Sequence, residues 1–305
     1  MGFLLVGSLQ AQEATSEATP EATSEAGKSL FFDDFNYTGT DTTDFSDHGW
    51  IVRTADGWPG IPGAIWSKDS ISIVADPDQA GNQLIEMHAS SDGTTIHQAQ
   101  LCQQRKFFEG TYASRVHFTD APASGPDGDN IVETFYQISP LAFDLDPNYS
   151  ELDYEYLPNG GWGTDPHFLA VTSWETFRQD PWLADNTSDS MEVSFAGWHT
   201  LVMQVADGEI NYYLDGHLIA THDGKYYPEV PMSMNYNLWF IDGGQIASKD
   251  PRQYVEQVDW SFHAANTLLS PDEVAAQIEQ MRTDKVSYVN SVPMEDPPLK
   301  SPCNF

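Results

Sequence analysis

Five residues in the middle of the chain, Glu151-Leu152-Asp153-Tyr154-Glu155, alternate acidic and apolar side chains. Successive side chains of a β-strand point to opposite faces, so the three acids share one face and the two apolar residues share the other. Leucine and tyrosine can fill a core, but three neighbouring carboxylates repel one another and are hard to explain by folding. The alternation therefore predicts a strand that presents carboxyl groups for chemistry or for a bound cation.

The spacing of the two glutamates suits cleavage of a glycosidic bond. Four strand steps separate their Cα atoms by roughly 13 Å, and inward-leaning side chains bring the carboxyl groups to about 5–6 Å. Retaining glycosidases need about 5–5.5 Å between nucleophile and acid/base, whereas inverting enzymes need a wider gap. With Glu151 and Asp153 ionised nearby, Glu155 should keep its proton to higher pH and can serve as general acid. The motif alone is also compatible with an exposed acidic edge strand, because the chain holds 46 Asp and Glu residues.

Short alternating segments broken by Gly, Pro, Asn and Asp surround this strand. Their density, with almost no helical periodicity, predicts an all-β fold, a two-sheet antiparallel β-sandwich. Asp207-Gly208 and Asp215-Gly216 predict tight turns at the two ends of the strand 209–214. The expected strands are 70–74, 83–88, 111–118, 151–155, 199–205 and 210–214.

One short C-terminal helix is expected after the strands. Ser270-Pro271-Asp272-Glu273 has the pattern of a capping box with proline in the first turn, and Val274, Ile278 and Met281 then fall on one face. The Pro-rich tail from Val292 is expected to lie along the surface. Cys102 and Cys303 are the two cysteines; they could form one disulfide in an oxidising compartment or remain thiols in the cytosol, and they make a zinc or iron–sulfur site improbable.

Four segments are expected along the chain. Residues 1–12 have an apolar run and small residues typical of a partial secretory signal peptide. Residues 13–28, with a repeated Glu-Ala-Thr-Ser/Pro unit, are expected to form a disordered linker. Residues 29–266 form the predicted β-jelly-roll catalytic domain, and residues 267–305 the helix and tail. The first segment predicts a secreted protein.

The charge of the chain restricts its partners. Thirteen Lys and Arg residues face 46 Asp and Glu residues, which gives a formal net charge of −33. This field repels nucleic acid, anionic membrane surfaces and sulfated or uronic-acid polymers, so a neutral polysaccharide is the expected substrate. No run reaches the roughly 18–20 apolar residues of a membrane span. We expect a monomer that requires no cofactor.

Several segments resemble glycoside hydrolase family 16 in order and spacing. Glu151-Leu-Asp-Tyr-Glu-Tyr-Leu157 resembles the family's E-I-D-I-E-F-L strand, in its compact E-x-D-x-E form. The other matching segments are Phe108-Glu-Gly-Thr-Tyr-Ala-Ser-Arg115, Phe195-Ala-Gly-Trp-His-Thr-Leu201, Glu209-Ile-Asn-Tyr-Tyr-Leu-Asp-Gly-His-Leu218, Met234-Asn-Tyr-Asn-Leu-Trp239 and Gln257-Val-Asp-Trp-Ser-Phe262. Together they cover about 230 residues, from Phe31 to His263.

The resemblance implies roles for the three acids. It makes Glu151 the nucleophile, Asp153 its assisting acid and Glu155 the acid/base, in a concanavalin A-like jelly roll whose substrate cleft crosses the concave face. Since the compact motif occurs in lichenase-like and xyloglucan-active members, it implies an endo-β-glucanase on a neutral β-1,3-1,4- or β-1,3-glucan. This sequence departs from the family at Phe135-Tyr136, where Phe-Trp is frequent, and in an unusual loop between Trp174 and Trp182.

A sugar cleft needs aromatic faces for stacking and amides for hydroxyl groups. The candidates for substrate binding are Trp162, Trp174, Trp182, Asn237 and Trp239. Trp239 could equally belong to the core, and Asn237 could be a structural amide.

Family members often hold a structural Ca²⁺ between the first and last strands. Here Asp259 and the pair Asp33-Asp34 could supply its oxygen ligands, although ordinary surface acids explain these residues as well.

Two other functions remain open for the chain. One is a non-catalytic, lectin-like carbohydrate-binding module, because the same architecture hosts many binding proteins. The other is a transglycosylase on xyloglucan-type chains, in which the covalent intermediate passes to a sugar instead of water.

Overall fold

The computed structural model describes residues 29–37, 43–164 and 166–303. The predicted signal peptide and linker, residues 1–28, lie outside the described residues, so those two predictions stay untested. Within the described part of the chain, no helix is long and apolar enough to cross a membrane.

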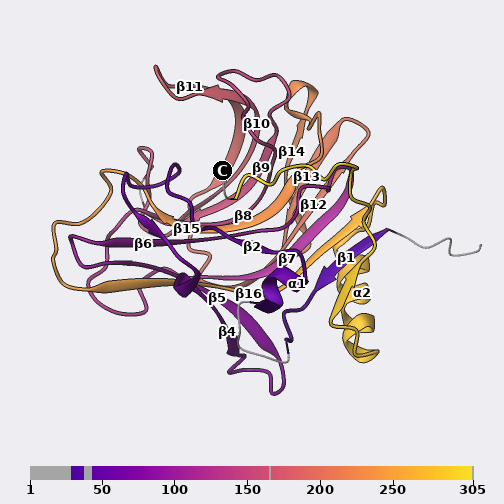
Figure 1. Cartoon of the computed structure of the whole chain (residues 1–305), viewed down its shortest axis with the longest axis horizontal. Helices are drawn as coiled ribbons and strands as arrows, with labels where there is room; N and C mark the ends of the chain where they lie inside the picture. The colour runs from indigo at the N-terminus through magenta and orange to yellow at the C-terminus, as the bar shows by residue number, and fades with distance from the viewer. Residues whose placement is uncertain (1–28, 38–42, 165, 304–305) are drawn as a thin grey trace, which may run out of the picture.

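Two layers of antiparallel strands form the sandwich (Figure 1). The cleft sheet carries the acidic strand β9 near its middle, between β8 and β10. Its strands, in the order of their pairing, are β2 (Ile51–Val52), β6 (Ile96–Cys102), β15 (Ser233–Phe240), β8 (Ile131–Ile138), β9 (Glu151–Leu157), β10 (Phe168–Arg178) and β11 (Leu183–Met191).

The back sheet covers the other side of the core. Its pairing order is β4 (Ile71–Ala75), β5 (Gln83–Ser91), β16 (Arg252–Ala265), β7 (Gly110–Phe118), β12 (Gly197–Ala206), β13 (Glu209–Leu214) and β14 (His217–Asp223). Strand β1 (Leu30–Asp33) lies between the end of β16 and β17 (Tyr288–Asn290). The remaining elements are α1 (Thr43–Asp47), β3 (Ile65–Trp66), η1 (Lys68–Ser70), η2 (Gly224–Tyr226) and α2 (Pro271–Thr283).

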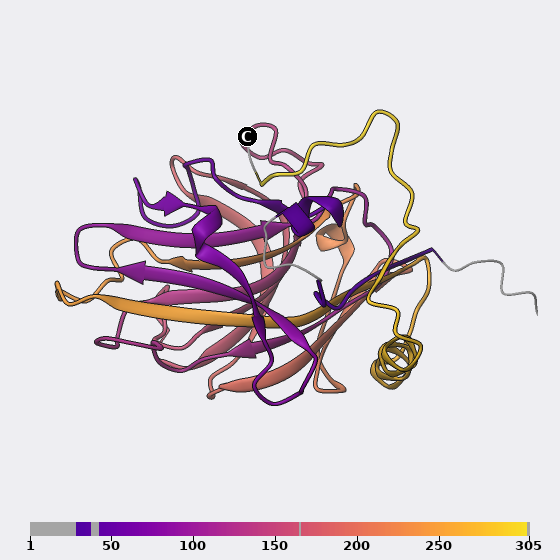
Figure 2. The ribbon, with the colours of Figure 1, turned by 60° about the horizontal axis from the view of Figure 1, so that its bottom comes forward.

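The jelly-roll prediction is confirmed, and so are its local signals. Both residues of Asp207-Gly208 and of Asp215-Gly216 have positive φ, as the tight turns around β13 require. Helix α2 begins with the predicted capping box at Ser270 and packs its apolar face on the outside of the back sheet (Figure 2).

The C-terminal tail does more than lie on the surface. It adds strand β17 beside β1 and then runs across the molecule toward the end of the chain (Figure 2). There Cys303 lies against Ile51 of β2 and forms a disulfide with Cys102 of β6. Their Cα atoms are 5.8 Å apart. Both alternatives for the cysteines were open in the sequence; the structure pairs them and ties the tail to the edge of the cleft sheet.

Candidate active site

Strand β9 presents its acids to a cleft of about 1210 Å³. Leu152 and Tyr154 are buried between the two sheets, as their alternation predicts. Glu151, Asp153 and Glu155 point the other way and line the cleft. The hydrophobic effect acting on one face of the strand therefore fixes the direction of all three carboxyl groups on the other.

Two of the three carboxyl groups are held by aromatic hydrogen-bond donors. The hydroxyl of Tyr149 donates to Oε2 of Glu151. The indole Nε1 of Trp174 donates to Oδ2 of Asp153 at 2.9 Å. Among the described residues, no side chain donates a hydrogen bond to Glu155. The first two groups are fixed in position, whereas Glu155 keeps its oxygens available for a bound molecule.

Burial and mutual repulsion make these acids reluctant to ionise. Burial raises the pKa of Glu151 to about 7, against the hydrogen bond from Tyr149, which lowers it. Burial, followed by the charge of Glu151, raises the pKa of Glu155 to about 8. The pKa of Asp153 is raised well above its ordinary value by burial and by both glutamates. The site can therefore hold an ionised Glu151 and a protonated Glu155 at the same pH, as acid-assisted displacement needs.

A polar chain crosses the floor of the cleft beside the acids. Nη1 of Arg53 donates to Oε1 of Gln100 at 2.9 Å, and Nε2 of Gln100 donates to the hydroxyl of Tyr136 at 2.5 Å. Tyr136 lies directly opposite Asp153 in the register of β8 and β9. Since its oxygen already accepts from Gln100, its own proton can be donated to a sugar hydroxyl or to an acid of the site. This tyrosine stands where the resemblance leads one to expect tryptophan.

Aromatic side chains form two walls of the cleft, one toward each end of β9. Near Glu151 the rings of Trp58, Phe177 and Trp182 follow one another, with centroids 5.6 and 5.9 Å apart. Beyond Glu155, the ring of Trp162 lies against that of Trp239, with ring centroids 6.2 Å apart. We call these the Trp58 wall (Trp58, Phe143, Tyr149, Phe177 and Trp182) and the Trp162 wall (Trp162, Trp239 and Ile241); all eight side chains line the cleft.

All five residues predicted to bind substrate line this cleft. Trp162 and Trp182 are 56% and 57% exposed, so their faces are open for stacking. Asn237 is buried in the floor of the cleft, Trp239 is a buried member of the Trp162 wall, and Trp174 orients Asp153 as well as lining the cleft. Oδ1 of Asn237 is buried and accepts no hydrogen bond from the part of the chain that the structure describes, which leaves it an unused acceptor at the cleft floor.

Other cleft residues were missed by sequence reasoning. Trp58 is 53% exposed and Phe143 is 61% exposed, and both belong to the Trp58 wall. A signal for Trp58 exists in the sequence, since it lies in the turn-forming run Gly57-Trp58-Pro59-Gly60, where a large aromatic side chain is hard to bury. Phe143 and Gln100 carry no comparable signal.

The structure gives the proposed calcium ligand other partners. Asp259 is completely buried, and its carboxylate accepts from Arg115 at 2.8 Å and from Arg282 at 2.7 Å. Asn82 donates to the same carboxylate. In the described residues, no group of three or more acids, histidines or cysteines lies close enough together to hold a metal. The calcium prediction thus gains no support at Asp259, whose oxygens are already used by guanidinium groups.

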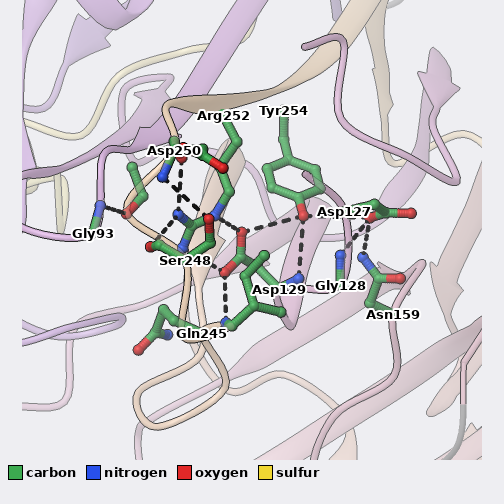
Figure 3. A network of polar contacts seen from close by, with 12 residues as sticks. Gly93, Asp127, Gly128, Asp129, Asn159, Gln245, Ser248, Asp250, Arg252 and Tyr254 are labelled. Carbon is green, nitrogen blue, oxygen red and sulfur yellow. Dashed lines mark hydrogen bonds and ion pairs between the residues drawn. The ribbon is translucent and has the colours of Figure 1, made fainter. Parts of the chain in front are cut away.

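A buried ion pair between Arg252 and Asp129 lies near Asn159, in the turn that precedes Trp162 (Figure 3). Arg252 of β16 makes two hydrogen bonds to the carboxylate of Asp129, and both side chains are inaccessible to solvent. Asp129 also accepts from the backbone of Ile246 at 3.0 Å. The neighbouring Asn130 donates to the carbonyl groups of Asn159 and Gly160, in the turn that precedes Trp162. The ion pair thereby joins the loop before β8 to the two loops that carry the Trp162 wall.

Comparison with solved structures identifies the same fold in several enzymes. The β-glucanase of Bacillus licheniformis matches with a TM-score of 0.55 at 17% identity, over 79% of this chain and all of that chain. A Bacteroides ovatus family 16 enzyme of a mixed-linkage glucan locus, solved with a G4G4G3G product, matches with a TM-score of 0.57 at 15% identity, over 76% of this chain and 98% of its own. The laminarinase of Flavobacterium sp. UMI-01 matches with a TM-score of 0.53 at 16% identity, over 76% of this chain and 98% of the laminarinase chain.

Sequence comparison adds nothing to these matches, because no protein-family model and no curated protein sequence matches the chain. The structural matches, at 13–18% identity, extend over three quarters or more of the chain. This chain therefore has the fold of the family 16 glycoside hydrolases.

Proposed function

We propose that this protein is a secreted, retaining endo-β-glucan hydrolase that cleaves a neutral β-1,3-1,4- or β-1,3-glucan by double displacement. The observation that carries the proposal is the face of β9, where Glu151, Asp153 and Glu155 line one cleft with an aromatic wall on either side. The solved structures that share the fold include a β-glucanase, a mixed-linkage glucan enzyme and a laminarinase, which supports this substrate class.

The geometry supports a two-step reaction. The carboxylate of Glu151 attacks the anomeric carbon, the glycosidic C–O bond breaks, and Glu155 gives its proton to the departing oxygen. Glu155 then takes a proton from water as the water oxygen attacks the same carbon and the ester bond to Glu151 breaks. Asp153 has a raised pKa and holds a proton. It can share this proton with Glu151, whose negative charge is lost when the ester forms and returns when the ester breaks.

The shape and charge of the cleft support an internal cut in a neutral chain. Its lining extends across the cleft sheet, from Gln100 on β6 to Ser190 on the edge strand β11, so a polymer can cross the acids. Of the described residues that line the cleft, Arg53 is the one with a cationic side chain, and Gln100 and two backbone carbonyls already accept its hydrogen bonds. An anionic sugar would therefore meet several acids and no free cation.

Export is supported by the disulfide between Cys102 and Cys303. Disulfides persist in oxidising compartments and are rare in the cytosol. The disulfide agrees with the apolar, small-residue start of the chain.

The direct test is a screen for new reducing ends on barley β-glucan, lichenan, laminarin, xyloglucan and agarose. We expect cleavage of one or more of the first three, and ¹H NMR should show the β-anomer forming before mutarotation. Binding without cleavage would favour the lectin-like alternative, and products longer than the substrate would favour transglycosylation. An initial α-anomer would contradict the retaining mechanism.

The pH profile of kcat/KM should be a bell whose limbs lie near pH 7 and pH 8. Activity rises with pH as Glu151 ionises, since its pKa is raised to about 7, and falls as Glu155 loses the proton it must donate, since its pKa is raised to about 8. Initial rates on soluble glucan at low substrate concentration, measured from pH 4 to 10, provide the test. A maximum at pH 4–5, as for ordinary carboxylic acids, would contradict the proposed burial of the pair.

Replacing Trp58 by alanine should raise KM for a long glucan by about five-fold or more, because a stacked aromatic face contributes about 1 kcal/mol. Its exposed ring packs at a tilt against Phe177 at the rim of the Trp58 wall, and within the described residues it belongs to none of the buried hydrophobic clusters. The control is Leu218→Ala, an equally exposed apolar residue of the back sheet. Equal KM values for W58A and wild type would remove Trp58 from the binding surface.

A further inference from the structure

Tyr149 is a buried tyrosine whose hydroxyl group, among the described residues, forms a hydrogen bond only at the candidate active site. It is 1% exposed, and its hydroxyl donates to Oε2 of Glu151. No inference from the sequence assigned it a role; it lies two residues before the first acid and, like Glu151, lines the cleft.

The backbone on both sides of Tyr149 is fixed. Its amide donates to the carbonyl of Asp146 at 3.2 Å, and the carboxylate of Asp146 accepts from two further amides of the same turn. The next residue, Ser150, donates its hydroxyl to Glu229 at 2.8 Å. The ring of Tyr149 packs edge-on against Phe177 at 5.2 Å. The phenol therefore has one orientation, and it is the one that reaches Glu151.

The phenol remains a donor throughout the working pH range. Burial and the adjacent charge of Glu151 raise the pKa of Tyr149 well above its ordinary value, so the hydroxyl keeps its proton. Oε1 of Glu151 has no hydrogen-bond partner among the described residues. One oxygen of the carboxylate is thus held by the phenol while the other is left for attack.

We infer that Tyr149 is a positioning residue for the nucleophile, and that it acts mainly on the second displacement; the inference rests on the proposed function. In the first step Oε1 bonds to the anomeric carbon, and Oε2 becomes the carbonyl oxygen of an ester, a weaker acceptor for the phenol. In the second step water attacks the anomeric carbon, the bond from that carbon to Oε1 breaks, and the electron pair returns to the carboxylate. The hydrogen bond from Tyr149 strengthens as this charge returns, so it stabilises the departing carboxylate.

The other titratable groups around Glu151 do not take the place of this donor in the structure. Asp153 can share its proton with Glu151 during the reaction, but among the described residues no hydrogen bond joins Asp153, Glu155 or Tyr136 to Glu151, and Tyr136 interacts with it through charge. From β10 the facing residue is Trp174, which donates to Asp153. Tyr149 is therefore the one side chain of the described residues that donates to Glu151.

Tyr149→Phe tests the inference, with Tyr154→Phe as the matched control. Both tyrosines are fully buried and close to Glu151 in the sequence: Tyr149 comes two residues before it and Tyr154 three residues after it. The hydroxyl of Tyr154, however, donates to the backbone carbonyl of Val202 in the core. The substrate is a gluco-oligosaccharide with a dinitrophenyl leaving group, which makes the first step fast. For Y149F we expect kcat and KM to fall together by about 10- to 100-fold, with a burst of dinitrophenol near one equivalent per enzyme.

The pH profile gives a second, independent readout. Loss of the donor removes the interaction that favours ionised Glu151, so the acid limb of kcat/KM should move upward by about one pH unit. Y154F should lose thermal stability while its burst and its acid limb match the wild type. Difluorotyrosine at position 149, a stronger donor that keeps the ring and the fold, should move the acid limb downward.

Two outcomes separate failure of the inference from failure of the proposed function. If Glu151→Gln hydrolyses glucan at the wild-type rate, the proposed function falls. If Glu151→Gln is inactive but Y149F shows neither a burst nor a moved acid limb, the role of Tyr149 alone is overturned. An effect in Y154F equal to that in Y149F would also overturn it, because the loss would then follow from packing.

Discussion

Glu151→Gln and Glu155→Gln should each lower kcat/KM on the cleaved glucan by about 10²–10⁴-fold or more. Glutamine keeps the size of each side chain but can neither attack as a carboxylate nor give up a proton. The measurement is the initial rate of reducing-end release, with Glu192→Gln as control, because it removes one charge from an exposed position on the surface. Wild-type activity in either active-site variant would end the proposal.

Azide can separate the roles of the two glutamates. In Glu151→Ala, azide can enter the space of the lost carboxylate and attack once, so a β-linked substrate should give an α-glycosyl azide. In Glu155→Ala the covalent intermediate still forms on Glu151, and azide attacks it second, so the product should be the β-azide. The same anomer from both variants would contradict the assignment of nucleophile and acid/base.

Neither glutamine variant should be unstable. The pKa values of Glu151 and Glu155 are raised in the folded protein, to about 7 and about 8, above the value near 4.3 of an unfolded glutamate. The folded state therefore binds more protons than the unfolded state between these values, and stability falls as pH rises from about 4 toward 8. Glutamine removes this loss, so thermal unfolding at pH 8 should occur at the wild-type temperature or above it.

The parts of the site that follow from local rules could be predicted from the sequence. The direction of the three acids on β9 depends on the two-residue period of a strand and on Leu152 and Tyr154 seeking the core. The turns around β13 depend on Asp-Gly pairs that tolerate positive φ. These signals act over a few residues, and the structure reproduces them.

The missed features depend on partners that are distant in the sequence. Trp58 reaches the cleft because its loop packs near Phe177, about 120 positions later, and no local pattern encodes that contact. The segment from Trp174 to Trp182, expected to be a loop, continues as the end of β10 and a hairpin turn into β11. Strand β11 is an exposed edge strand with the polar sequence LADNTSDSM, so it lacks the alternation that reveals a half-buried strand.

The partners of the Asp259 carboxylate are also distant in the sequence and could not be predicted from it. The sequence identifies a carboxylate near the end of the back sheet but not the guanidinium groups that meet it. Arg115 and Arg282 come from β7 and α2, 144 and 23 positions away. A candidate metal ligand and a buried structural ion pair therefore look alike until the tertiary contacts are known.

Arg252→Met should lower the free energy of unfolding by about 3–5 kcal/mol, the usual cost of leaving one member of a buried ion pair without its partner. Arg252 makes two hydrogen bonds to Asp129, and neither side chain reaches solvent (Figure 3). Methionine fills the space of the arginine stem but leaves the carboxylate uncompensated. At about 2–4 °C per kcal/mol for a domain of this size, the melting temperature should fall by about 10 °C.

The double variant Asp129→Asn with Arg252→Met distinguishes charge from packing. Asparagine keeps an oxygen that can accept from the amide of Ile246, which bonds Oδ1 of Asp129 at 3.0 Å, but it brings no charge into the interior. The double variant should therefore be more stable than Arg252→Met alone, with a coupling energy of about 1–3 kcal/mol in a double-mutant cycle. Additive losses would mean that Arg252 acts through packing alone.

The same variants connect this ion pair with the active site. Asn130, next to Asp129, holds the turn before Trp162 through two backbone carbonyls, and its own carbonyl accepts from Ile241 of the Trp162 wall. Below its melting temperature, Arg252→Met should therefore raise KM for long glucans while the limbs of its pH profile stay in place, because β9 and its acids are untouched. The double variant should restore KM as it restores stability. A moved pH limb with unchanged KM would mean that the ion pair supports the acids and not the wall.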